Sequence, residues 1–220
     1  TGLTIQNGNV PDKTHFKFML DTVKKILKIG SILIFDCGAN TKKNKEKIRE
    51  ALFNYLTLKQ KHVKAYLKYI KIFQEHEKEI FIVNEVEYKC VKIKEENEVK
   101  YIFFSEKVKK EQLEKKERRF KKALERGDKT LVKFKKEKDL AKFITREGDI
   151  FAKGELQKNL TEVINPFITG LEGYFILESS VDESSEKILK LYKDRDKAEK
   201  LIRAIKEGTE LRPIRHWSRN

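Results

Sequence analysis

Cysteines and long apolar runs are both scarce in this sequence. The 220 residues contain only two cysteines, Cys37 and Cys90, with no CxxC pair and no histidine at ligand spacing. This pattern argues against a structural zinc site and a disulfide framework, and it favours a reducing, cytoplasmic setting. The longest apolar runs, such as Ser31 to Phe35, are far too short to span a membrane, so we expect no membrane partner. No Ser-His-Asp or Cys-His constellation for nucleophilic catalysis is visible either.

Positive charge is the strongest bulk feature. Lys and Arg total 50 against 35 Asp and Glu, which gives a net charge of +15. A basic excess of this size suits a polyanionic partner, because each Lys or Arg placed on a phosphate releases a counterion. A lysine-rich proteome is the alternative explanation, since Lys far outnumbers Arg. Charge alone therefore does not establish DNA binding.

The first part of the chain alternates strand-like and helix-like patterns. Short apolar runs of strand length alternate with amphipathic stretches, which predicts an α/β sheet layered with helices. The run that ends at Phe35 is continuously apolar, as in strands that are buried on both faces. The expected elements are a strand at 3–6, a helix at 13–27, a strand at 31–35, a helix at 42–52 and a strand at 55–59.

The pattern changes after Gln60. Strand-like segments around a charged turn and one long, highly charged helix suggest an insertion, mostly β, that lies beside the sheet. The α/β pattern then resumes with a strand and a long last helix that ends near Glu207. The expected elements are strands at 81–91, 99–104 and 130–134, a helix at 105–125, and a strand at 173–177. We therefore divide the chain into a core at 1–59, an insertion at 60–170 and the rest of the core at 171–220.

Asp36 is the first candidate for chemistry. It follows a buried strand and precedes a glycine-containing loop, which is where α/β proteins place their active sites. A carboxylate is hard enough to bind Mg²⁺ or Mn²⁺ through oxygen. The alternative is an aspartate that only caps the loop.

Glu199 is the second candidate. It belongs to a polar stripe on the last helix with Tyr192, Arg195 and Lys206, at spacings of three, four and seven residues. At about 100° per residue these side chains share one narrow face, at the rim of an apolar stripe. The apolar stripe consists of Leu191, Ala198, Ile202 and Ile205. The alternative is an ordinary helix surface with an Arg195–Glu199 ion pair.

These motifs together resemble a known family. The stretch from Tyr192 to Lys206 is similar to the Tyr-Arg-Glu-Lys signature of the insertion-sequence-four group of DDE transposases. The tail Leu211–Trp217 resembles the 1634-type branch of that group. Upstream, Phe35–Asn40 is similar to the family's Asp-x-Gly-x-Asn at the second catalytic acid, and Gly8–Asp12 resembles its Gly-Asn-x-x-Asp turn.

The resemblance implies a ribonuclease H-like mixed sheet flanked by helices, with the insertion described above. It implies that Asp36 and Glu199 are catalytic ligands of two Mg²⁺ or Mn²⁺ ions, and that Tyr192, Arg195 and Lys206 contact DNA phosphate. The activity implied is metal-dependent cleavage of transposon ends followed by strand transfer. The implied partner is double-stranded DNA, bound by a homodimer in a prokaryotic cytoplasm.

The family has a third acid, on an opening strand upstream of the Gly8–Asp12 turn. Asp12 is expected to cap a helix and Asp21 to lie within it, so neither replaces this acid, and we expect this chain to be cut from a longer protein. With two of three acids, it should bind DNA with strong salt dependence but not cleave it alone. The alternatives are a non-catalytic basic DNA-binding module and an inert transposase remnant. The mechanism further predicts that the Asp36 and Glu199 carboxylates lie within about 8 Å of each other.

Overall fold

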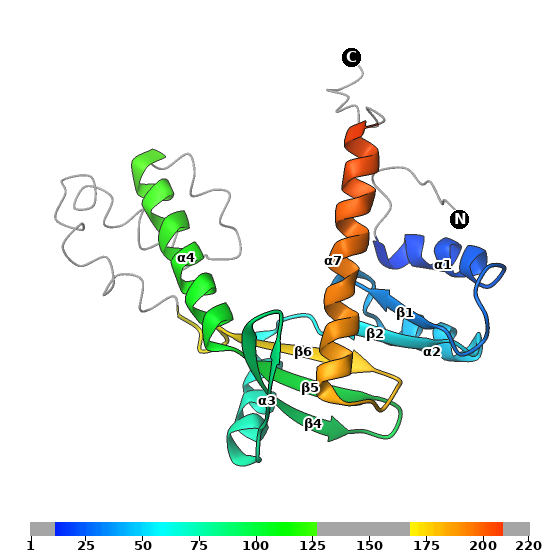
Figure 1. Cartoon of the computed structure of the whole chain (residues 1–220), viewed down its shortest axis with the longest axis horizontal. Coiled ribbons are helices and arrows are strands. Elements are labelled where there is room, and N and C mark those ends of the chain that lie inside the picture. Colours follow the sequence, from blue (N-terminus) through cyan, green and yellow to red (C-terminus); the bar gives the residue numbers. More distant parts are fainter. Residues whose placement is uncertain (1–11, 127–167, 209–220) are drawn as a thin grey trace. The chain divides into compact units, whose positions relative to one another are not determined.

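The computed structural model describes residues 12–126 and 168–208 (Figure 1). The strands expected at 3–6 and 130–134, the Gly8–Asn9 turn and the tail after Gly208 lie outside these ranges. The described helices are α1 (Asp12–Val23), the short 3₁₀ helix η1 (Cys37–Ala39), α2 (Lys42–Glu50), α3 (Val63–Glu75), α4 (Glu106–Arg126) and α7 (Ser185–Gly208). The strands are β1 (Ile32–Phe35), β2 (Asn54–Leu58), β3 (Glu79–Val83), β4 (Val86–Lys94), β5 (Val99–Phe104) and β6 (Tyr174–Ser179).

The six strands form one mixed sheet in the order β1-β2-β6-β5-β4-β3. β1 and β2 run parallel, whereas β2 pairs antiparallel with β6 and β3 pairs antiparallel with β4. The α/β class predicted from the sequence is therefore confirmed. None of the helices in the described ranges is both long enough and apolar enough to cross a membrane.

Two compact units divide the described residues. Unit 1 contains those up to residue 60, those at 92–101 and those from 177 onward, and unit 2 contains those at 61–91 and 102–176. The sequence placed all of 60–170 beside the sheet, but β3, β4 and β5 belong to the sheet itself. The burial of β5 explains the difference, because its residues from Val99 to Phe103 are all buried, as in a strand covered on both faces.

The core of unit 1 supports the strand that leads to Asp36. Phe16 and Leu20 of α1 are buried against β1, where Leu33 and Phe35 are also buried. The Phe16 and Phe35 rings lie 5.0 Å apart between centroids. β1 is thus held on one side by α1 and along its length by its parallel pairing with β2.

Several element boundaries differ from the sequence prediction. α1 ends at Val23 rather than at residue 27. The strand expected at 81–91 is a hairpin, because Asn84 and Glu85 turn the chain with φ of 52° and 60°. Helix α3 was not predicted as an element, although Tyr66, Ile70 and Phe73 are its buried residues at helical spacing.

Candidate active site

Asp36 lies at the C-terminal end of β1 and begins the loop that leads to α2. Its Oδ1 atom accepts a hydrogen bond of 2.6 Å from the backbone N–H of Cys37, so it caps the short helix η1. The side chain is nevertheless 65% exposed. The capping role and an accessible carboxylate therefore occur together at this residue.

The far end of the same loop is held by Asn40. Its side-chain Nδ2 donates to the carbonyl oxygen of Leu58 and to Oε2 of Glu178, both at 2.9 Å. The next residue, Thr41, caps α2 by accepting a bond of 3.2 Å from the Asn44 N–H. These contacts connect the loop to the end of β2 and to β6, and they were not predicted from the sequence.

Glu178, the acid that Asn40 contacts, is buried with two cations. Its side chain is 3% exposed and lies 2.6 Å from Lys45 Nζ and 2.7 Å from Lys59 Nζ. Burial alone would raise the pKa of Glu178, but the hydrogen bonds from Lys45, Lys59 and Asn40 outweigh it and lower the pKa to about 2. The carboxylate is therefore charged at all physiological pH values.

A second acid extends this buried group within unit 1. Glu98 Oε2 lies 2.7 Å from Lys45 Nζ and accepts a hydrogen bond of 2.9 Å from the Tyr55 hydroxyl. Burial raises the pKa of Tyr55, and the nearby Glu98 charge raises it further. We call Asn40, Lys45, Lys59, Glu98 and Glu178 the buried ionic cluster. Each charge in it faces an opposite one, which buried charges require.

Helix α7 supplies the second half of the candidate site. Ser184 is its N-cap, because its hydroxyl accepts a bond of 3.3 Å from the Lys187 N–H, and Ile188 and Leu189 near its start are buried. Further along, Nη1 of Arg195 lies 3.6 Å from Oδ1 of Asp36. Two motifs far apart in the sequence thus meet in unit 1.

Arg195 was predicted to contact DNA phosphate, and it lies here beside a carboxylate. Its guanidinium carbon is 5.1 Å from the centroid of the Tyr192 ring, a cation–π arrangement that orients the planar group. The neighbouring Cys37 is not a good nucleophile. Burial and then the Asp36 carboxylate raise the pKa of its thiol, although Arg195 acts in the opposite direction.

Glu199 and Lys206 lie on α7, but their side chains are outside the described residues. Glu199 follows Arg195 by four residues, and a helix brings such residues to the same side, about 6 Å apart along its axis. Its distance to Asp36 stays a prediction. In the apolar stripe, Leu191 is half-buried, and Ala198, Ile202 and Ile205 also have side chains outside the described set. No group of three His, Cys, Asp or Glu side chains gathers among the described residues.

Comparisons with family models, with curated proteins and with solved structures give no match for this chain.

Proposed function

We propose that the chain is the later part of a DDE transposase catalytic domain, with a ribonuclease H-like core, which cleaves and joins DNA with divalent metal ions. One observation carries the proposal. The Asp36 carboxylate, at the end of a half-buried parallel strand, lies 3.6 Å from Arg195 of the signature helix. The two motifs that resemble the family are thus neighbours in space, although nothing in the local sequence requires it.

The chemistry of Asp36 fits a divalent cation. Carboxylate oxygens are the ligands that Mg²⁺ and Mn²⁺ prefer, and this carboxylate is open to solvent. A bound metal pair would supply positive charge for the attacking and leaving oxygens of a phosphodiester. Glu199 would complete the ligand set from α7, together with a third acid from the family's opening strand.

Arg195 would have two roles in this proposal. An arginine carries five N–H donors in a fixed plane, so one edge can face Asp36 while the other meets a DNA phosphate. Stacking on Tyr192 limits the freedom of the guanidinium before any substrate binds. Lys206 would add a point charge further along α7. Double-stranded DNA and a second copy of the chain are the proposed partners.

Calorimetric titration with Mn²⁺ tests the proposal, because a purely basic DNA-binding module has no reason to bind the metal at Asp36. We expect Asp36→Asn to weaken Mn²⁺ binding by about tenfold or more, which corresponds to about 1.4 kcal/mol. Asp21→Asn is the matched control, since Asp21 is 62% exposed and belongs to no motif. Equal Mn²⁺ affinities for the two variants would contradict the proposal. Both variants should unfold like the parent protein, as exposed substitutions usually do.

A further inference from the structure

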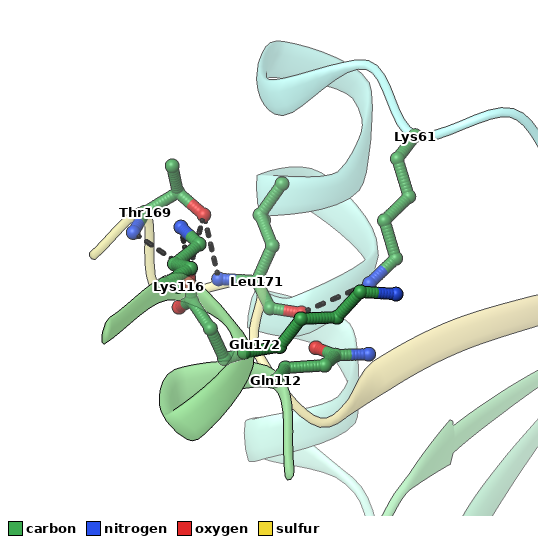
Figure 2. Close-up of a pocket in the computed structure, with 7 residues that line it drawn as sticks. Lys61, Gln112, Lys116, Thr169, Leu171 and Glu172 are labelled. Atoms are coloured by element: carbon green, nitrogen blue, oxygen red, sulfur yellow. Dashed lines mark hydrogen bonds and ion pairs between the residues drawn. The ribbon is translucent and has the colours of Figure 1, made fainter. Parts of the chain in front are cut away.

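Unit 2 contains a pocket of about 270 Å³ that the proposed cleavage site does not use. Its wall comes from three segments: Lys61 (two residues before α3), one face of α4, and the turn before β6 (Figure 2). The lining residues are Lys61, Gln112, Lys115, Lys116, Thr169, Leu171 and Glu172. Three lysines and one acid therefore share a small volume.

The acid is already neutralised by its own partners. Glu172 Oε1 lies 2.9 Å from Lys116 Nζ and accepts bonds of 3.0 Å from both the backbone N–H and the hydroxyl of Thr169. Burial would raise the pKa of Glu172, but these bonds outweigh it and lower the pKa to about 2. Lys116 and Glu172 thus form a stable pair that adds no net charge to the pocket.

Lys61 and Lys115 are the remaining cations. Lys61 Nζ donates to the carbonyl oxygen of Leu171 at 3.4 Å and lies 5.9 Å from the centroid of the Tyr66 ring. The hydrogen bond is long and uses one proton of the ammonium, so a ligand can accept another. Lys61 is an exposed residue. Partial desolvation lowers the pKa of its ammonium group, the Glu172 charge raises this pKa, and the Lys116 charge lowers it further. An anion beside Lys61 would relieve that unfavourable environment.

Gln112 gives the pocket an oriented neutral donor. Its side-chain oxygen accepts a bond of 3.0 Å from the backbone N–H of Gly173, which fixes the orientation of the amide. The NH₂ group then faces away from that bond. In Figure 2 the Lys61 ammonium and the Gln112 amide turn toward the same side of the pocket, while Lys116 is grouped with Thr169.

Gly173 adds rigidity to this wall. Its φ is +81°, and a Cβ atom placed there would lie 2.8 Å from both the Ser105 carbonyl oxygen and the Lys109 side chain. Only glycine suits this conformation and this close approach. The Gln112 amide is consequently held against a backbone segment that is itself closely packed.

From this geometry we infer that the pocket of Lys61, Lys115 and Gln112 binds a phosphate group of a nucleic-acid strand. Two ammonium groups and an oriented amide match a tetrahedral anion that accepts several hydrogen bonds. The net charge of +15 favours a polyanion as the source of that phosphate. The inference rests on the pocket and not on metal-dependent cleavage, and it can be tested without divalent metal.

The test compares Gln112→Glu with Lys110→Gln in the full chain. Each substitution lowers the net charge by one, and Lys110 is an exposed residue of the same helix that does not line the pocket. Gln112→Glu keeps an oxygen for the Gly173 N–H, so the fold should be retained, but it puts a negative charge where the amide donor was. Anisotropy of a labelled DNA duplex, measured in EDTA at several KCl concentrations, gives affinity and salt slope.

We expect Gln112→Glu to weaken duplex binding at least about fivefold more than Lys110→Gln does. We also expect it to reduce the slope of log binding constant against log salt concentration by about the amount of one phosphate contact. Lys61→Gln should behave like Gln112→Glu. A titration with inorganic phosphate, monitored through the NMR signals of the Gln112 side-chain amide, shows whether the pocket binds free phosphate as well as the phosphate of a DNA strand. If those signals shift but Gln112→Glu and Lys110→Gln bind DNA equally well, the site is one for free phosphate. If the two variants bind DNA equally well and inorganic phosphate does not move the amide signals, the inference is overturned.

Discussion

The two ends of the loop from Asp36 to Asn40 differ sharply in how they are held. At the first end, the Asp36 carboxylate is 65% exposed, and its ion pair with Arg195 is as long as 3.6 Å. At the other end, Asn40 contacts Glu178, whose side chain is 3% exposed and paired with two lysines at 2.6 and 2.7 Å. Five residues thus connect an open carboxylate to the buried ionic cluster.

This difference suggests that the solvent access of the Asp36 carboxylate and the positioning of its loop depend on different residues. A carboxylate that must accept a metal or face a phosphate has to stay accessible, so it cannot be fixed by its own burial. Its position can instead be set by the backbone on both sides. β1 holds one side through its parallel pairing with β2, and Asn40 holds the other. The buried ionic cluster therefore serves as a support for the candidate site.

Removing the buried acid should have the largest effect on stability. Glu178→Gln leaves Lys45 and Lys59 near a neutral amide, which should lower the free energy of unfolding by about 3 kcal/mol. Glu186→Gln is the matched control, because the Lys190–Glu186 pair has the same 2.6 Å length as the Lys45–Glu178 pair but is exposed on α7. It should cost less than about 1 kcal/mol. Urea unfolding measures both, and equal losses would show that burial does not matter here.

The same acid should make stability depend on pH in a defined window. Its pKa falls from the ordinary glutamate value of 4.5 to about 2 in the folded chain. A depressed pKa stabilises the folded state above the unfolded pKa, and this contribution is lost as the pH falls toward 2. The loss should approach roughly 3 kcal/mol. Since Glu172 titrates in the same direction, the test is the difference between the parent and Glu178→Gln, which should shrink between pH 5 and pH 2. A constant difference would contradict the assignment.

Substitution of Asn40 should lower stability less than Glu178→Gln does, but it should clearly weaken Mn²⁺ binding at the candidate site. Asn40→Ala removes two hydrogen bonds, one of them to a buried carboxylate, at a cost of about 1–3 kcal/mol. The folded variant should also bind Mn²⁺ more weakly, because the loop that carries Asp36 loses its second support. Asn54→Ala also removes two side-chain hydrogen bonds, one donated to the Gly30 carbonyl and one accepted from the Ser180 hydroxyl, neither of which involves this loop. If both variants keep the parent affinity for Mn²⁺, Asn40 does not support the site.

The sequence was most informative where patterns are local. The apolar run before Asp36 predicted β1, and the Asn44–Ile48 region was placed on a helix, which corresponds to α2. The long last helix was expected to end near Glu207, one residue before its observed end at Gly208. These elements depend on periodicity and capping, which neighbouring residues determine.

The buried ionic cluster had no local signal. Lys45, Glu98 and Glu178 come from three distant segments, and each is a common surface residue type. Only the tertiary fold buries Lys45 and Glu178 and partly buries Glu98. The β3–β4 hairpin was missed for a related reason. Glu85 has a positive φ that sequence rules assign to Gly or Asn, so the turn did not stand out within a strand-like run.

The most direct test of the central claim is paramagnetic broadening by Mn²⁺ in NMR spectra of the chain. The proposal predicts that the backbone amide signals of Cys37 and Gly38 and those of Arg195 to Glu199 broaden together at the lowest Mn²⁺ concentrations. It also predicts that Asp36→Asn removes both effects while Asp21→Asn removes neither. Broadening that begins instead around the acidic turn at Glu95–Glu98, or that persists in Asp36→Asn, would contradict a metal site formed by Asp36 and α7.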